Sequence, residues 1–106
     1  MGIDTNLEQE LVRRILAVSK PQRVILFGSA AAGQMGRDSD IDLLVVEQRP
    51  ANTRAEGIKI RRALGDVGYP VDVIVMASER FEESKDVMGG LAYPAHHEGR
   101  VLYEVA

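Results

Sequence analysis

The chain has 106 residues, of which 45% are apolar and 27% charged, and it contains no cysteine. This composition is typical of a globular protein and excludes disulfides and thiolate metal sites. The net charge of −3 argues against nucleic acid as a partner. No apolar run approaches the roughly 20 residues of a membrane-spanning helix, which argues against a membrane partner. We therefore expect one cytoplasmic domain over residues 1–106.

The first half of the chain predicts helices and strands in alternation. T-N-L-E at residues 5–8 is typical of a capping box that begins a helix, which Pro21 ends. Residues 24–27 are a short apolar run typical of a buried strand, followed by a Gly-Ser turn and a short helix over residues 29–35. Residues 41–46 predict the second strand.

The second half continues this pattern. Apolar spacing predicts a helix that ends near Asp66, and residues 71–76 predict a third strand. Ser78 is expected to cap a helix through about Val87, and residues 91–106 to form a final helix. The order αβαβαβαα indicates an α/β fold, with a small mixed β-sheet flanked by helices.

Two of the expected strands carry aspartates. Side chains alternate between the two faces of a strand, so Asp40 and Asp42 share a face, and Asp72 stands beside them if the strands are neighbours. A lone Asp-x-Asp is more often a solvated strand end, and a lone Asp72 an edge residue facing water. Three adjacent carboxylates without a Lys or Arg repel one another, and a hard cation such as Mg²⁺ relieves this repulsion.

The turn at Gly28 and Ser29 strengthens the functional interpretation. A Gly-Ser turn between a strand and a helix exposes N–H groups and a hydroxyl that bind anions. An anion site beside a metal site is what a triphosphate with Mg²⁺ requires. The segment has the glycine spacing of a P-loop, but Gln34 and Met35 stand where that motif needs Lys and Ser or Thr.

Together these residues resemble the signature of the DNA polymerase β-like nucleotidyltransferase superfamily. Gly28 and Ser29 are followed by ten residues and then by Asp40-x-Asp42, and Asp72 matches the third acidic residue of that family. In length the chain is similar to the minimal nucleotidyltransferases (MNT), which often pair as antitoxins with a small helical HEPN-domain toxin. Residues 98–104 also resemble the closing helix of that group.

The resemblance implies a Mg²⁺-dependent enzyme that moves a nucleotidyl group, AMP from ATP, to a hydroxyl of a partner. Asp40 and Asp42 would hold two Mg²⁺ ions, and Asp72 would complete the metal site and accept the proton. The nucleotide's phosphates would lie at Gly28 and Ser29.

Three observations leave alternatives open. Ser39, next to Asp40, either contacts the nucleotide or caps its loop. Ala30 and Ala32 stand where minimal nucleotidyltransferases often carry Arg, which favours an alternative: a weak or inert binding module that acts through protein–protein contact. The adjacent pair at residues 96 and 97 is histidine, but neighbouring helix residues point about 100° apart, so we expect a solvated helix face rather than a metal pair.

Overall fold

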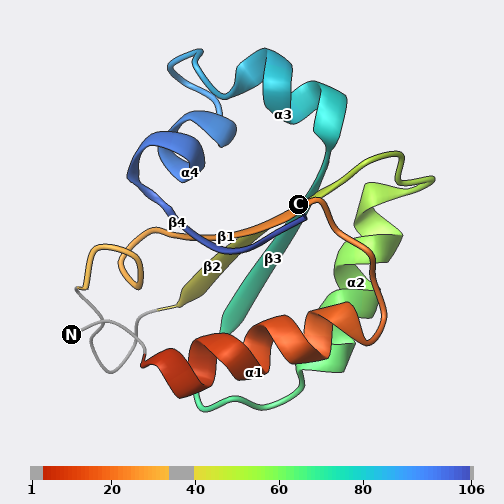
Figure 1. Ribbon diagram of the computed structural model, residues 1–106, viewed down its shortest axis with the longest axis vertical. Coiled ribbons are helices and arrows are strands. Elements are labelled where there is room, and N and C mark those ends of the chain that lie inside the picture. The colour runs from red at the N-terminus through yellow and green to blue at the C-terminus, as the bar shows by residue number, and fades with distance from the viewer. Residues whose placement is uncertain (1–3, 34–39, 106) are drawn as a thin grey trace.

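The protein, described here from a computed structural model that covers residues 4–33 and 40–105, contains one four-stranded mixed sheet between two pairs of helices (Figure 1). The strand order is β3-β2-β1-β4; β2 and β3 are parallel, and the other pairs are antiparallel. In chain order the elements are α1 (Thr5–Leu16), β1 (Arg23–Phe27), β2 (Ile41–Glu47), α2 (Thr53–Leu64), β3 (Val71–Ala77), α3 (Ser78–Ser84), α4 (Ala92–Glu98) and β4 (Arg100–Glu104). The predicted α/β class is confirmed. No helix in the described ranges is long and apolar enough to cross a membrane.

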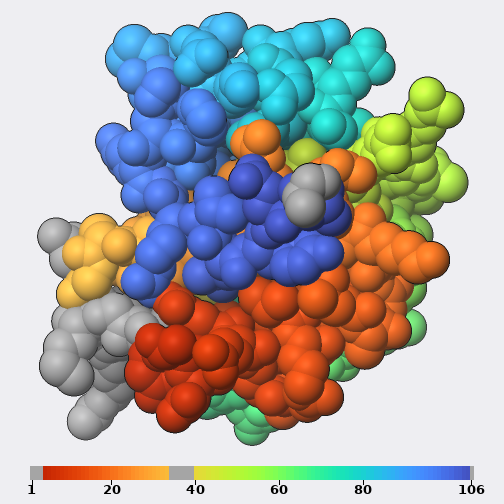
Figure 2. All heavy atoms as spheres, viewed as in Figure 1, coloured from red at the N-terminus to blue at the C-terminus, as the bar shows by residue number. Residues whose placement is uncertain are grey.

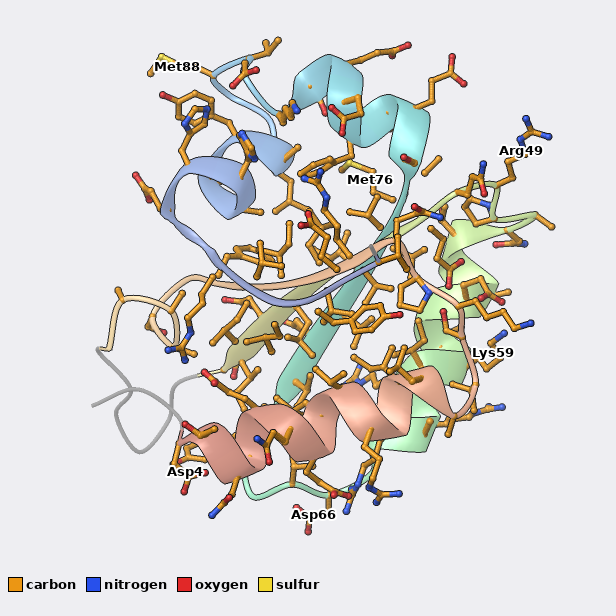
Figure 3. All side chains as sticks on the ribbon, in the orientation of Figure 1. Asp4, Arg49, Lys59, Asp66, Met76 and Met88 are labelled. Atoms are coloured by element: carbon orange, nitrogen blue, oxygen red, sulfur yellow. The ribbon has the colours of Figure 1, made fainter. Side chains whose placement is uncertain are left out.

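The alternation of side chains along the strands divides the core between the two faces of the sheet. On one face, Leu43 of β2 packs in a cluster with buried residues of α1 and α2. On the other, Leu44 packs with Phe81 of α3 and Ala95 of α4. Met76 of β3 lies on the α3 side, as Figure 3 shows, so alternate residues of β3 back to Asp72 share that face.

The largest error of the sequence analysis concerns the C-terminus. Residues 91–106 were expected to form one helix, but α4 ends at Glu98, and residues 100–104 form β4 against β1. Gly99 permits this change, because a Cβ there would lie 2.8 Å from Ile25 and 2.9 Å from the Leu26 carbonyl. The resemblance of residues 98–104 to a closing helix is therefore wrong. Figure 2 shows the side chains of β4 crossing the surface between α1 and the α3–α4 pair.

Other expectations also need correction. The observed element order is αββαβααβ, and residues 28–33 form turns instead of a helix; the rest of that expected helix lies outside the described residues. The cap of α1 is Asp4, not Thr5: the Asp4 carboxylate accepts from the N–H of Leu7 at 2.7 Å. Ser78 is the first residue of α3 and does not cap it. The two observed caps, Asp4 and Ala77, each lie one residue before the expected one, which is within the ordinary variation of helix boundaries.

Candidate active site

The acidic residues at the beginning of β2 and β3 lie side by side. Asp42 and Asp72 are direct partners in the parallel β2–β3 register, and Asp40 immediately precedes β2. Because directly paired residues of adjacent strands project to the same face, Asp42 and Asp72 both face the α3–α4 side of the sheet. The expected juxtaposition of these two carboxylates is confirmed.

The turn after β1 meets this cluster. The last residue of β1, Phe27, is the register partner of Asp42, so Gly28 follows directly beside the carboxylate. Gly28 has a φ of 74°, and a Cβ built on it would overlap the Asp42 carboxylate. Glycine is thus required here for both backbone conformation and space. The turn continues through the half-buried Ser29, and the Ala32 N–H donates to the Gly28 carbonyl at 3.1 Å.

The charge of Asp42 is poorly stabilised by its surroundings. Burial raises the pKa of Asp42, and the neighbouring carboxylates of Asp72 and Asp40 raise it further. Within residues 4–33 and 40–105, none of these three carboxylates forms an ion pair with a Lys, Arg or His. An external cation would supply the missing countercharge.

The donor chemistry of the cluster fits Mg²⁺. All three side chains offer carboxylate oxygens, which are the ligands that Mg²⁺ prefers in proteins. The cluster is open: in the described part of the chain, its ligand atoms do not all lie within 4.8 Å of one another. Joint binding of one Mg²⁺ by all three carboxylates therefore requires movement of their side chains, with waters and substrate phosphates completing the shell of the ion.

The remaining predicted positions around the turn are less informative. Ser39 lies outside the described residues. Ala30 is 2% exposed and packs in the core cluster on the α1–α2 face, whereas Ala32 is exposed. Neither side chain brings a charge to the turn.

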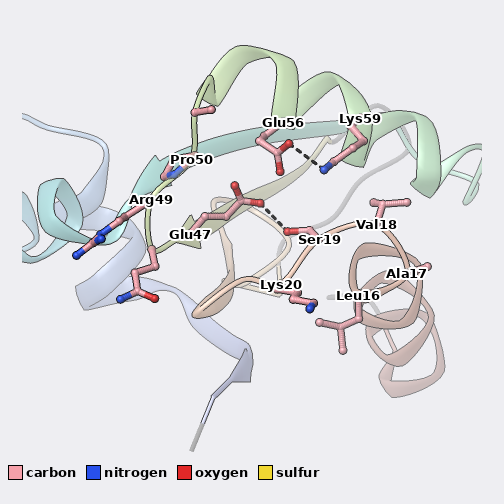
Figure 4. A pocket seen from close by; sticks show the side chains of 12 residues that line it. Leu16, Ala17, Val18, Ser19, Lys20, Glu47, Arg49, Pro50, Glu56 and Lys59 are labelled. Atoms are coloured by element: carbon pink, nitrogen blue, oxygen red, sulfur yellow. Dashed lines mark hydrogen bonds and ion pairs between the residues drawn. The ribbon is translucent and has the colours of Figure 1, made fainter.

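A pocket of about 590 Å³, which no local sequence pattern indicates, lies at the opposite end of β2 (Figure 4). Its wall includes Glu47, the last residue of β2, which is only 7% exposed. The Ser19 hydroxyl donates to the Glu47 carboxylate at 2.5 Å, and Lys59 of α2 pairs with Glu56 at 2.8 Å. The apolar run of β2 does not indicate that Glu47 at its end is buried. The residue that donates a hydrogen bond to this buried carboxylate, Ser19, is distant in the sequence.

The electrostatics of Glu47 differ from those of Asp42. Burial raises the pKa of Glu47 and nearby Glu56 also raises it, while the hydrogen bond from Ser19 and the charge of Lys59 oppose this change. The pocket end of β2 thus carries its own donor and cation. Because Glu47 has these partners within the protein, we interpret it as a structural carboxylate.

Comparison with known proteins agrees with the fold and gives the family. The model of the nucleotidyltransferase domain family matches residues 6–93. The chain belongs to this family, so the family assignment made from Gly28-Ser29 and Asp40-x-Asp42 is confirmed. No curated protein matched the chain.

Solved structures share the fold. A toxin–antitoxin complex with AMP-PNP contains a chain with 22% identity and a TM-score of 0.65, covering 92% of this chain and 73% of that one. A mutant MntA–HpeT toxin–antitoxin complex gives 20% identity and a TM-score of 0.60, covering 92% and 73%. The tri-AMPylated HEPN toxin of Shewanella oneidensis with its MNT antitoxin gives 19% identity and a TM-score of 0.56, covering 97% and 74%. At these identities the likeness establishes the fold.

Proposed function

We propose that the protein is a Mg²⁺-dependent nucleotidyltransferase that transfers AMP from ATP to a hydroxyl group of a partner protein. The single observation that carries this proposal is the register pairing of Asp42 with Asp72 beside the Gly28 turn. Membership of the nucleotidyltransferase domain family supports the reaction class. The proposed catalytic unit is one minimal nucleotidyltransferase domain over residues 1–106.

The metal ligands in this proposal are Asp40, Asp42 and Asp72, which together hold two Mg²⁺ ions. When bound, Mg²⁺ neutralises charge on the triphosphate and lowers the pKa of the attacking hydroxyl. Asp72 accepts the hydroxyl proton as the acceptor oxygen forms its bond to the α-phosphorus. The bond from that phosphorus to the bridging oxygen breaks, and pyrophosphate leaves.

The nucleotide-binding residues in the proposal are Gly28, Ser29 and Ser39. Gly28 leaves room for the chain to pass beside the Asp42 carboxylate. The N–H groups of the turn and the Ser29 hydroxyl would orient the phosphates relative to the acidic cluster. This placement holds the reacting phosphate in position, a large part of catalysis in phosphoryl and nucleotidyl transfer.

The proposed acceptor is a small helical HEPN-type partner, with this protein as the cytoplasmic antitoxin. The support is the fold shared with an MNT antitoxin whose HEPN toxin is tri-AMPylated, and with a toxin–antitoxin complex that contains AMP-PNP. A partner that brings its own binding surface also suits a catalytic domain of this size.

The test uses α-labelled ATP, Mg²⁺ and, as the acceptor, the proposed small helical HEPN-type partner. We expect labelled partner with the wild type, and loss of labelling with EDTA, with Asp40→Asn or with Asp72→Asn. An unlabelled partner, or Asn variants as active as the wild type, would contradict the catalytic proposal.

The alternative is an inert module that silences its partner by contact. The specific observation in its favour is that Ala30 and Ala32 bring no positive charge to the phosphate-binding turn. Calorimetry with MgATP and with the partner separates the two functions. Tight partner binding without heat from millimolar MgATP would favour the inert module.

A further inference from the structure

A second cluster of ligand-type side chains lies away from the acidic cluster, between α3 and α4. Asp86 lies in the segment after α3, and His96 and His97 lie in the last turn of α4. The ligand atoms of these three residues all lie within 4.8 Å of one another, and His97 Nε2 is 2.9 Å from Asp86 Oδ1. All three side chains are exposed, so an ion in solution has access to them.

The two histidines converge although they are adjacent on a helix. Their ring centroids are 4.9 Å apart, with the planes at 78°. The His96 ring meets the buried Phe81 edge to face at 5.9 Å, and the His97 ring packs on Tyr93 at 4.3 Å. The expectation of a plain solvated face is therefore incomplete: the rings are exposed, but aromatic contacts hold them together.

We propose that Asp86, His96 and His97 bind a divalent transition-metal ion of the Zn²⁺, Co²⁺ or Ni²⁺ type. Two imidazoles and one carboxylate form a donor set that these ions accept, whereas Mg²⁺ favours oxygen ligands alone. Zn–N bonds of about 2.0–2.1 Å in a tetrahedral site place ligand atoms about 3.3 Å apart. The 2.9 Å separation and the 4.8 Å limit bracket this value, so the three ligand atoms already lie within reach of one ion.

Such an ion links the segment after α3 to the last turn of α4. These two helices cover the sheet face to which Asp42 and Asp72 belong. A ligand that binds the folded chain stabilises it by mass action, so metal raises the melting temperature. The site is chemically distinct from the oxygen-only acidic cluster, and its existence does not depend on nucleotidyl transfer.

The test titrates the full, tag-free chain with Co²⁺ alone, following the visible absorption of the ion, and repeats the titration with Zn²⁺ by calorimetry. We expect one ion per chain. Loss of an outer partner alone weakens metal sites by 10–100-fold, so His96→Asn, His97→Asn and Asp86→Asn should each weaken binding at least about tenfold. The matched control is Glu98→Gln, which removes a neighbouring exposed charge but no ligand and should bind as the wild type does.

A second control separates the two clusters. The double variant Asp40→Asn, Asp42→Asn should retain Co²⁺ binding with unchanged absorption. Loss of binding in this variant, wild-type affinity in the histidine variants, or one ion per two chains would each overturn the proposal. Circular dichroism of every variant verifies folding, which substitutions of exposed side chains should preserve.

Discussion

Each end of β2 carries a carboxylate, and the groups that surround the two carboxylates differ. Burial raises the pKa of both Asp42, at the beginning of the strand, and Glu47, at its end. Glu47 accepts a hydrogen bond from Ser19 and lies near the charge of Lys59. Among the described residues, the charged neighbours that act on Asp42 are Asp72 and Asp40. Glu56 adds negative charge beside Glu47 as well, but there the Ser19 hydroxyl and Lys59 oppose it, whereas no Lys, Arg or His that the structure describes pairs with Asp42.

The largest expected effect is the difference in the rate of AMP transfer when the carboxylate at one or the other end of β2 is replaced. Asp42→Asn should lower the rate of AMP transfer at least about 100-fold, because metal-ion stabilisation of transition-state charge is worth several kcal/mol. Glu47→Gln should transfer AMP at nearly the wild-type rate. Labelled-ATP assays with matched protein concentrations measure both. Equal losses in the two variants would remove the functional distinction between the ends.

The next largest effect is the loss of folding stability when a side chain is added at Gly28, which lies against Asp42. Gly68→Ala, at a φ of 91° with open space around it, should cost about 1 kcal/mol from backbone strain alone. Gly28→Ala adds the overlap with Asp42 and should cost at least about 1 kcal/mol more. Urea unfolding gives the two values, and calorimetry should show weakened MgATP binding for Gly28→Ala alone. Equal costs would mean that Asp42 moves aside freely.

Removal of the hydrogen bond from Ser19 tests the structural role of Glu47 at the pocket end of β2. Ser19→Ala should destabilise the fold by about 1–2 kcal/mol, because it removes the donor to a buried carboxylate. The matched control is Ser84→Ala, whose exposed hydroxyl donates to the Arg80 carbonyl and should contribute less than about 0.5 kcal/mol. Chemical denaturation measures both. A Ser19 effect no larger than that of Ser84 would contradict the structural role of Glu47.

The smallest expected effect is the change in stability of the metal-free protein when Asp42 loses its charge. The folded-state pKa of Asp42 is raised, so the ionised group opposes folding at neutral pH, and this cost fades as the pH falls through that pKa. Asp42→Asn without Mg²⁺ should therefore raise the melting temperature by about 1–4 °C at neutral pH, and the gain should shrink in acid. Glu83→Gln, an exposed charge on α3, should change little. A pH-independent difference would count against the electrostatic cause.

Local sequence patterns predicted the strands of the site but not every element around it. Strand alternation placed Asp42 beside Asp72 on the condition that their strands are neighbours, and the parallel β2–β3 register meets that condition. The strand β4 was missed because its pairing with β1 is long-range and depends on the close approach at Gly99.

The other omissions also depend on tertiary contacts. The burial of Glu47 rests on Ser19, which approaches from the segment after α1. The convergence of His96 and His97 rests on packing against Phe81 and Tyr93. The contact of Tyr93 with His97 is local, since both lie on α4, but Ser19 and Phe81 come from segments that meet their partners only in the folded chain.

The central claim is that Asp40, Asp42 and Asp72 bind Mg²⁺ jointly beside the phosphate-binding turn. Calorimetric titration of the wild type with a non-hydrolysable ATP analogue, with Mg²⁺ and then with EDTA, tests it most directly. We predict binding that requires Mg²⁺ and is abolished in Asp42→Asn but retained in Glu47→Gln. Binding that is equal with and without Mg²⁺, or unchanged by Asp42→Asn, would contradict the claim.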